Sequence, residues 1–147
     1  MVRDDLRDPA VLRLYDYWRA KAGTRFAPAR ADIDPVDFAF ALADVALIDV
    51  LGAEPLAWRY RVVGGNLAAR DGYDLTGKTL ADLPHPEYRE RVRASWGQVA
   101  ASRQPAHAIR ETVFDRRNRR YESLILPLSA DGAEVDMLLA IQRHLGR

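Results

Sequence analysis

Three histidines, His85, His107 and His144, are the side chains of this sequence best suited to proton transfer or metal binding near neutral pH. They are widely separated, and no two lie one helical turn apart, which is the spacing typical of a helical zinc site. We therefore predict no metal site. His107 falls in a predicted strand, where it fits either a hydrogen-bonded role in the sheet or a place in a ligand pocket.

Carboxylates are the other candidates for proton transfer, which requires a dry cleft and a second polar group nearby. Glu111 and Glu122 fall in predicted strands, and neighbouring arginines such as Arg110 and Arg120 favour solvated, paired charges across the sheet. One enzyme hypothesis stays open, in which Glu122 and His107 act as proton shuttles in a small α+β barrel. A hydrogen-bonded pair of these side chains inside an open cleft would support it.

No motif of a known catalytic type is present in the sequence. Gly64, Gly65 and Asn66 follow a predicted strand, but they lack the glycine spacing of a dinucleotide site, and no nucleophile or phosphate-loop motif occurs. Because the sequence contains no cysteine, a disulfide, a thiol nucleophile and a cysteine-ligated metal are excluded. We therefore expect a protein that is not an enzyme.

The densest local charge is an arginine cluster formed by Arg116, Arg117, Arg119 and Arg120. An exposed hairpin tip explains it, and a charged tip also discourages edge-to-edge aggregation. The alternative is a docking patch for an acidic partner or for nucleic-acid phosphate, because guanidinium groups pair well with oxyanions. The net charge of +1 argues against a dedicated nucleic-acid binder.

The first element predicted to position these side chains is a helix with clear ends. Asp8 suits the cap, Pro9 suits the first turn, and Gly23 is a natural stop. An aromatic-rich apolar stripe recurs between them at helical spacing. Two interpretations of the stripe stay open: it covers the domain's own sheet, or part of it pairs with a second copy of the chain. The candidate dimer or partner residues are Val11, Leu14, Tyr15 and Trp18.

Strand patterns follow in two groups. The apolar run at 45–50 fits a central strand, and residues 58–62 alternate aromatic or β-branched side chains with arginine, as in a half-buried strand. Three further runs, at 106–114, 120–128 and 135–142, are separated by polar hairpin connections. The pattern predicts an α+β fold with about five strands in one antiparallel sheet and helices packed on one face.

Helices are predicted between the two groups of strands. Short ones are expected at 36–41, after Asp34 and Pro35, and at 67–70, with Asn66 as the cap. A longer helix follows Pro86 and packs through a stripe at three- or four-residue spacing. The stripe consists of Tyr88, Val92, Trp96 and Val99.

The segment from Val63 to Leu80 resembles a known pattern. A strand ending in Val-Gly-Gly-Asn, a short helix, Gly-Tyr-Asp and then Leu-Thr-Gly-Lys-Thr-Leu is similar to PAS sensory domains. Residues 14–19, 31–35 and 126–129 narrow the resemblance to the bacterial PAS_5 subfamily, and the likeness covers nearly the whole chain.

The resemblance implies one PAS-like domain over residues 1–147. Residues 1–30 would form the additional N-terminal amphipathic helix and a loop, and residues 31–147 the PAS core. The resemblance further implies the strand order of PAS domains, in which the last strand lies in the centre of the sheet, beside the first.

The resemblance also implies a sensory or protein-interaction module of signal transduction, with a small ligand or none. We expect a homodimer that contacts a signalling protein. In the PAS arrangement several aromatic and polar side chains would converge between sheet and helices, where they suit a ligand cleft or fill a core. These pocket candidates are Trp58, Tyr60, Asn66, Tyr73, Trp96 and His107.

The sequence does not name a cofactor, but it disfavours two. The lack of cysteine excludes the cysteinyl-flavin photochemistry of light-sensing relatives, and His85 precedes the long helix on which haem-binding PAS domains carry a histidine. We expect neither flavin nor haem. The N-terminus has no apolar core of a signal peptide, and no stretch approaches the ~20 apolar residues of a membrane span. A cytoplasmic protein without membrane or nucleic-acid partners is predicted.

Overall fold

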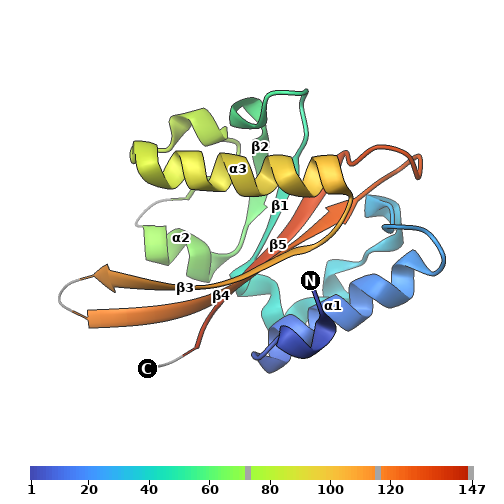
Figure 1. Cartoon of the computed structure of the whole chain (residues 1–147), viewed down its shortest axis with the longest axis horizontal. Coiled ribbons are helices and arrows are strands. Elements are labelled where there is room, and N and C mark those ends of the chain that lie inside the picture. Colours follow the sequence, from blue (N-terminus) through green and yellow to red (C-terminus); the bar gives the residue numbers. More distant parts are fainter. Residues whose placement is uncertain (72–73, 115–116, 146–147) are drawn as a thin grey trace.

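The computed structural model describes residues 1–71, 74–114 and 117–145, which form a five-stranded antiparallel sheet with helices on both faces (Figure 1). The strand order is β2-β1-β5-β4-β3, so the last strand lies centrally beside the first, which confirms the order that the resemblance implied. The strands are β1 (Val45–Asp49), β2 (Arg59–Val63), β3 (Ala106–Phe114), β4 (Arg117–Leu128) and β5 (Met137–His144).

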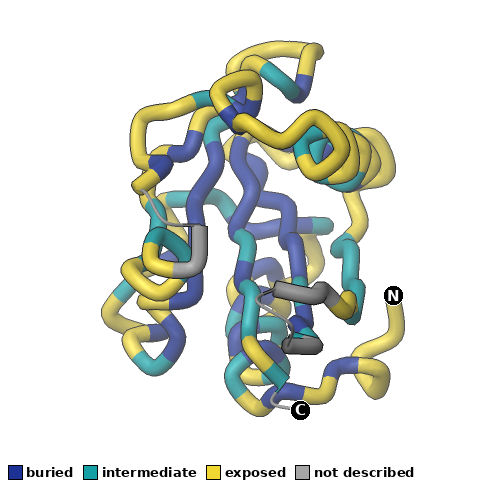
Figure 2. Tube along the Cα trace, turned by 90° about the vertical axis from the view of Figure 1, so that its left-hand side faces the viewer, coloured by how far each residue is buried: buried dark blue, intermediate teal, exposed yellow. Residues whose placement is uncertain are grey.

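The two faces of the sheet carry separate apolar clusters, because successive residues of a strand point to opposite sides. In β4, Leu124, Leu126 and Leu128 pack on the side of the N-terminal helix, whereas Ile125 faces the other helices. Buried residues accordingly follow the strands in the middle of the molecule, between outer layers that are mostly exposed (Figure 2). The sheet is therefore covered on both sides over its central strands.

Helix α1 (Pro9–Ala22) begins and ends at the residues that the sequence indicated. The Asp8 carboxylate accepts hydrogen bonds from the backbone N–H groups of Ala10 and Val11, at 2.8 and 3.2 Å. Gly23 ends the helix with a φ of 62°, which glycine adopts without steric cost. The cap and the stop thus set the length of the helix.

The apolar stripe of α1 packs against this chain's own sheet. Val11, Leu14 and Trp18 are buried, and the Trp18 indole N–H donates to the carbonyl oxygen of Pro127 at 2.8 Å. These three candidate dimer residues are therefore core residues, because their side chains lie between helix and sheet and not on an outer surface. Tyr15, the fourth candidate, is partly buried beside Trp18, with ring centroids 5.8 Å apart.

The predicted α+β fold is confirmed, with the helices divided between the two faces of the sheet. The 3₁₀ helix η3 (Pro35–Asp44) is longer than the predicted 36–41 segment, and its Phe38 and Ala41 pack in the same cluster as α1. Helices α2 (Gly65–Asp71) and α3 (Pro86–Ser102) cover the opposite face. The short elements η1 (Arg3–Asp5), η2 (Arg30–Asp32), η4 (Pro55–Ala57) and η5 (Leu80–Asp82) complete the described layers.

Gly64, and not Asn66, caps the start of α2. The backbone N–H groups of Leu67 and Ala68 both donate to the Gly64 carbonyl oxygen at 3.1 Å, and the Gly64 N–H donates to Val45 in β1 at 2.8 Å. Asn66 lies inside the first turn of the helix. The prediction of Asn66 as the cap was therefore wrong by two residues, and its side chain is available for another contact.

Replacing Gly64 with alanine should lower the free energy of unfolding by about 1–3 kcal/mol, the usual cost of inserting a methyl group into filled space. A Cβ atom at this position would overlap the backbone carbonyl oxygens of Ala43 and Leu42, which cannot move without shifting the chain before β1. Urea unfolding of Gly64→Ala measures the loss. Gly65→Ala is the matched control, because a Cβ there meets nothing within 4 Å. Equal urea midpoints for the two variants would contradict the expected steric clash at position 64.

Candidate functional site

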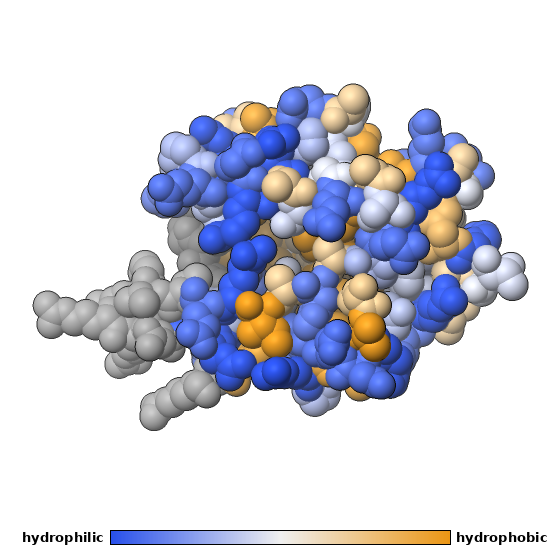
Figure 3. Space-filling view, viewed as in Figure 1, coloured by the Kyte–Doolittle hydropathy of each residue, from blue (hydrophilic) through white to orange (hydrophobic). Residues whose placement is uncertain are grey.

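A cleft of about 1140 Å³ lies between the sheet and the helices α2 and α3. Ile48, Ala108 and Ile125 line it from three different strands, and Val92 and Trp96 line it from α3. Hydrophilic side chains gather over α3 on the face drawn in Figure 3. The cleft is thus apolar within, beside a helix whose outer surface is polar.

Three of the predicted aromatic residues meet at one end of this cleft. Trp58 and Trp96 stack with ring centroids 6.0 Å apart and an interplanar angle of 11°, and Tyr60 contacts Trp96 edge-on at 5.3 Å. Trp58 is buried behind the others, where its indole N–H donates to the carbonyl oxygen of Gly52 at 3.0 Å. Tyr60 and Trp96 line the cleft, whereas Trp58 belongs to the core that supports them.

The remaining pocket candidates lie in different places. Asn66 lines the cleft from α2, and its side-chain amide donates to Asp44 Oδ1 at 3.1 Å. His107 lies at the rim of the cleft, but its ring nitrogen Nε2 is 2.8 Å from Glu122 Oε2. Tyr73 lies outside the described residues.

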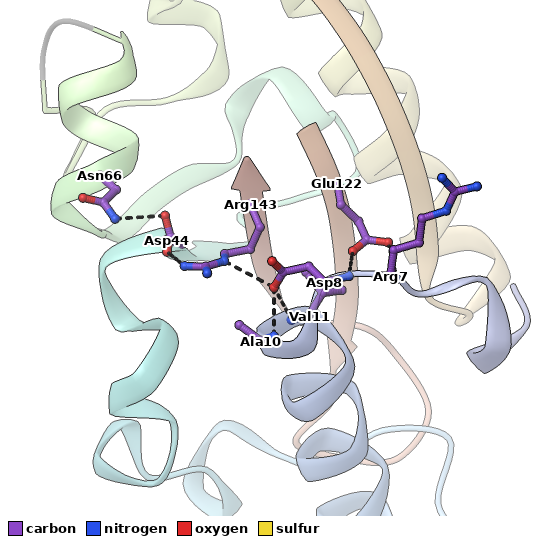
Figure 4. Close-up of polar contacts among 8 residues, drawn as sticks. All are labelled: Arg7, Asp8, Ala10, Val11, Asp44, Asn66, Glu122 and Arg143. Carbon is purple, nitrogen blue, oxygen red and sulfur yellow. Dashed lines mark hydrogen bonds and ion pairs between the residues drawn. The ribbon is translucent and has the colours of Figure 1, made fainter. Parts of the chain in front are cut away.

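Glu122 is the most deeply buried carboxylate of the described residues, with no solvent exposure. Its Oε2 accepts the backbone N–H of Arg7 at 2.9 Å, and its Oε1 accepts that of Asp8 at 2.7 Å (Figure 4). The prediction that Glu122 forms a solvated charge pair across the sheet is therefore wrong, because β4 directs its side chain to the face that the N-terminal segment covers. Glu111 does form such a pair, with Arg120 at 3.5 Å.

The His107 and Glu122 pair of the enzyme hypothesis is thus present, but not in the open cleft. Both carboxylate oxygens of Glu122 bind backbone N–H groups of the segment before α1. Leu124, the next residue of β4 on the same face, packs in the α1 cluster. The pair lies where a substrate in the cleft cannot reach the carboxylate, and its evident role is to bind the N-terminal segment to the sheet.

A second polar cluster connects α1 with α2. Arg143 of β5 donates from Nη1 to Asp44 Oδ2 at 2.6 Å and from Nε to Asp8 Oδ1 at 3.3 Å (Figure 4). The hydrogen bond to Asp44, together with the charge of Asp8, raises the pKa of Arg143 above its ordinary value. Because Asn66 also binds Asp44, four side chains form a continuous chain from the cleft to the cap of α1. We name these residues, Asn66, Asp44, Arg143 and Asp8, the polar relay.

Sequence reasoning missed Asp44 and Arg143. The one available signal was that Asp44 directly precedes a nearly continuous apolar strand, where a carboxylate needs a partner if it is buried. That signal does not name Arg143, which is 99 residues away in the sequence.

The family model of a PAS domain matches residues 6–142. This protein belongs to the PAS_5 family of PAS domains. A search of curated proteins finds no match. The cleft is therefore that of a PAS domain.

Solved structures share the fold of this PAS domain at low sequence identity. The PAS domain of Bordetella pertussis BvgS is 17% identical, with a TM-score of 0.57 over 78% of this chain and 89% of that chain. The Vibrio cholerae VqmA dimer is 9% identical, with a TM-score of 0.56 over 78% and 52%. The Rhodobacter sphaeroides LOV protein is 14% identical, with a TM-score of 0.50 over 78% and 70%. At these identities the likeness shows the fold alone.

Within residues 1–71, 74–114 and 117–145, no group of three or more His, Asp or Glu side chains is placed to hold a metal ion. None of the helices in that part of the chain is long and apolar enough to cross a membrane. His85 precedes α3 as its N-cap residue and lines the cleft.

Proposed function

We propose that this PAS domain, a sensory module of signal transduction, binds a small molecule in the cleft beneath α3 and transmits its presence to α1. PAS domains are typically non-catalytic, and we propose that this one works in the cytoplasm as a homodimer that contacts a signalling protein. The single observation that carries the proposal is the polar relay, because it begins at a residue that lines the cleft and ends at the cap of α1.

The cleft has the properties of a small-molecule site. Its volume of about 1140 Å³ is slightly above the range of about 300–1,000 Å³ typical of ligand pockets, and its lining is largely aliphatic and aromatic. A few polar side chains, Asn66, Ser123 and Gln142, also line it and would orient a ligand. These properties support binding of a molecule with an apolar body.

The polar relay supplies a route for the signal. A ligand can shift a conformational equilibrium only if it binds one arrangement more tightly than the other. A ligand that contacts Asn66 changes the partners available to Asp44, and Asp44 shares Arg143 with the cap of α1. The expected consequence is a change in how firmly the start of α1 is held against the sheet.

Filling the cleft should remove any molecule that the purified protein carries. Ala108 lies in β3 and lines the cleft, so Ala108→Phe occupies the space of a ligand. Native mass spectrometry, compared with the denatured mass, should detect a bound small molecule in the parent protein and not in this variant. Ala101→Phe, at an exposed position of α3 outside the cleft lining, is the matched control and should keep the bound mass. A bound mass that survives Ala108→Phe would contradict the proposed location.

A further inference from the structure

We infer that the molecule bound in this cleft is an amphiphilic organic anion, with a carboxylate, sulfonate or phosphate group held by arginines at the rim and an apolar body inside. The inference rests on the proposed function, since it names the chemical class of ligand for the same cleft. Two observations carry it: the sign of the charged residues that line the cleft, and the lack of partners for two of them.

The charged lining is basic from three separate elements. Arg91 of α3, Arg110 of β3 and Arg119 of β4 line the cleft, and among the described residues that line it none is acidic. This asymmetry does not follow from composition, because the chain has 22 basic and 21 acidic residues. Like charges converging on one cleft repel one another, and an anion placed between them relieves that repulsion.

The guanidinium groups of Arg91 and Arg110 are available to a ligand. Within the described part of the chain neither one forms a hydrogen bond or an ion pair through its guanidinium group, and Arg91 only approaches the Tyr88 ring, at 5.5 Å. The neighbouring arginines of α3 are occupied: Arg93 pairs with Glu90, and Arg89 donates to the Leu83 carbonyl oxygen at 3.0 Å. Arg91 is therefore the arginine of α3 whose guanidinium donors are unused by the described residues, and Arg110 adds a second such residue to the cleft lining.

The interior of the cleft requires that the anion carry an apolar part. Ile48, Ile125 and Trp96 are buried residues of the lining, and Val92 is a partly buried one packed against them. Inorganic phosphate would leave this apolar surface in contact with water, whereas an organic acid would cover it and direct its charge to the rim. Shape and charge together favour an amphiphile over a free inorganic ion.

Two pairs of probes that differ in charge and little else test the inference. Isothermal titration calorimetry compares 2-naphthoate with 2-naphthamide, a flat pair, and octanoate with octanamide, a flexible pair. In at least one pair the anion should bind about tenfold more tightly than the amide, the order expected of charge-assisted hydrogen bonds to arginine. Arg91→Gln and Arg110→Gln should each remove most of this preference and leave amide binding unchanged. Arg93→Gln, at a residue of α3 outside the lining, should leave both unchanged.

The possible results distinguish a failure of the inferred ligand class from a failure of the proposed function. If the amides bind as tightly as the anions, the inference is wrong and the cleft remains a binding site for neutral molecules. If an anion binds but its preference over the amide survives both Arg91→Gln and Arg110→Gln, the inference that these two arginines hold the anionic group is overturned. If no probe of either charge binds and the purified protein carries no mass, the inference and the ligand-binding part of the proposed function fail together.

Discussion

Replacing Glu122 with leucine should lower the free energy of unfolding by about 3 kcal/mol, because two backbone N–H groups and a histidine lose their buried, charged acceptor. The carboxylate has no solvent exposure, so water does not compensate for its loss unless the segment before α1 leaves the sheet. Urea unfolding measures the change. Limited proteolysis should also cut the variant first within residues 1–8, since these bonds hold that segment.

Two further variants separate the carboxylate from the general cost of a mutation in the sheet. Glu122→Gln keeps one acceptor oxygen and should lie between the parent protein and Glu122→Leu. Glu111→Gln changes an exposed carboxylate on the neighbouring strand, whose pair with Arg120 is solvated, and should shift stability by less than about 0.5 kcal/mol. A Glu122→Leu protein as stable as Glu111→Gln would show that the buried acceptor contributes nothing to the fold.

Arg143→Met should cost about 2–3 kcal/mol in unfolding free energy, because it leaves the nearly buried carboxylates of Asp44 and Asp8 without their guanidinium. The expected loss is below that of a fully buried ion pair, since the Arg143 side chain is 34% exposed. The cap of α1 should weaken with it, so amide hydrogen exchange at Val11 should accelerate more than exchange at the far end of the helix.

The double variant Arg143→Met with Asp44→Asn decides whether unpaired charge is the cause. Removing the charge of Asp44 should recover part of the loss, so that the double variant is more stable than Arg143→Met alone. Arg93→Met, which breaks an exposed pair with Glu90 on α3, is the control and should change stability little. If Asp44→Asn recovers nothing, the role of Arg143 is packing of its aliphatic stem and not compensation of charge.

Local signals in the sequence were sufficient for much of the fold. Asp8, Pro9 and Gly23 determine the ends of α1 through hydrogen bonds and torsions within a few residues, and those ends were predicted correctly. The alternation of side chains located β2, since the period of two is a property of the strand itself. Runs of strand length bounded by polar turn residues located the other strands. What a local pattern does not contain is the layer to which each helix belongs, so it did not indicate that η3 packs with α1 on the face opposite α2 and α3.

The polar contacts of the site were less predictable because they join distant segments. Glu122 binds residues more than a hundred positions away, and its orientation follows from the register of β3 and β4, in which Ile109 lies opposite it. Asn66 lines the cleft, but its predicted contact was wrong, because a capping rule considers only its own helix. A sequence indicates which side chains are unusual, but the partner of each depends on the tertiary fold.

The central position of β5 has a consequence for how the chain is made. β1 pairs with β2 and β3 pairs with β4, but only β5 connects the two hairpins into one sheet. A ribosome therefore releases both hairpins before the strand that joins them, and the backbone N–H and C=O groups along one edge of β1 and of β4 stay unpaired by β5 until residues 137–144 emerge. Assembly must then close long sequence separations, which is slow. Until then the unpaired strand edges make the nascent chain prone to aggregation.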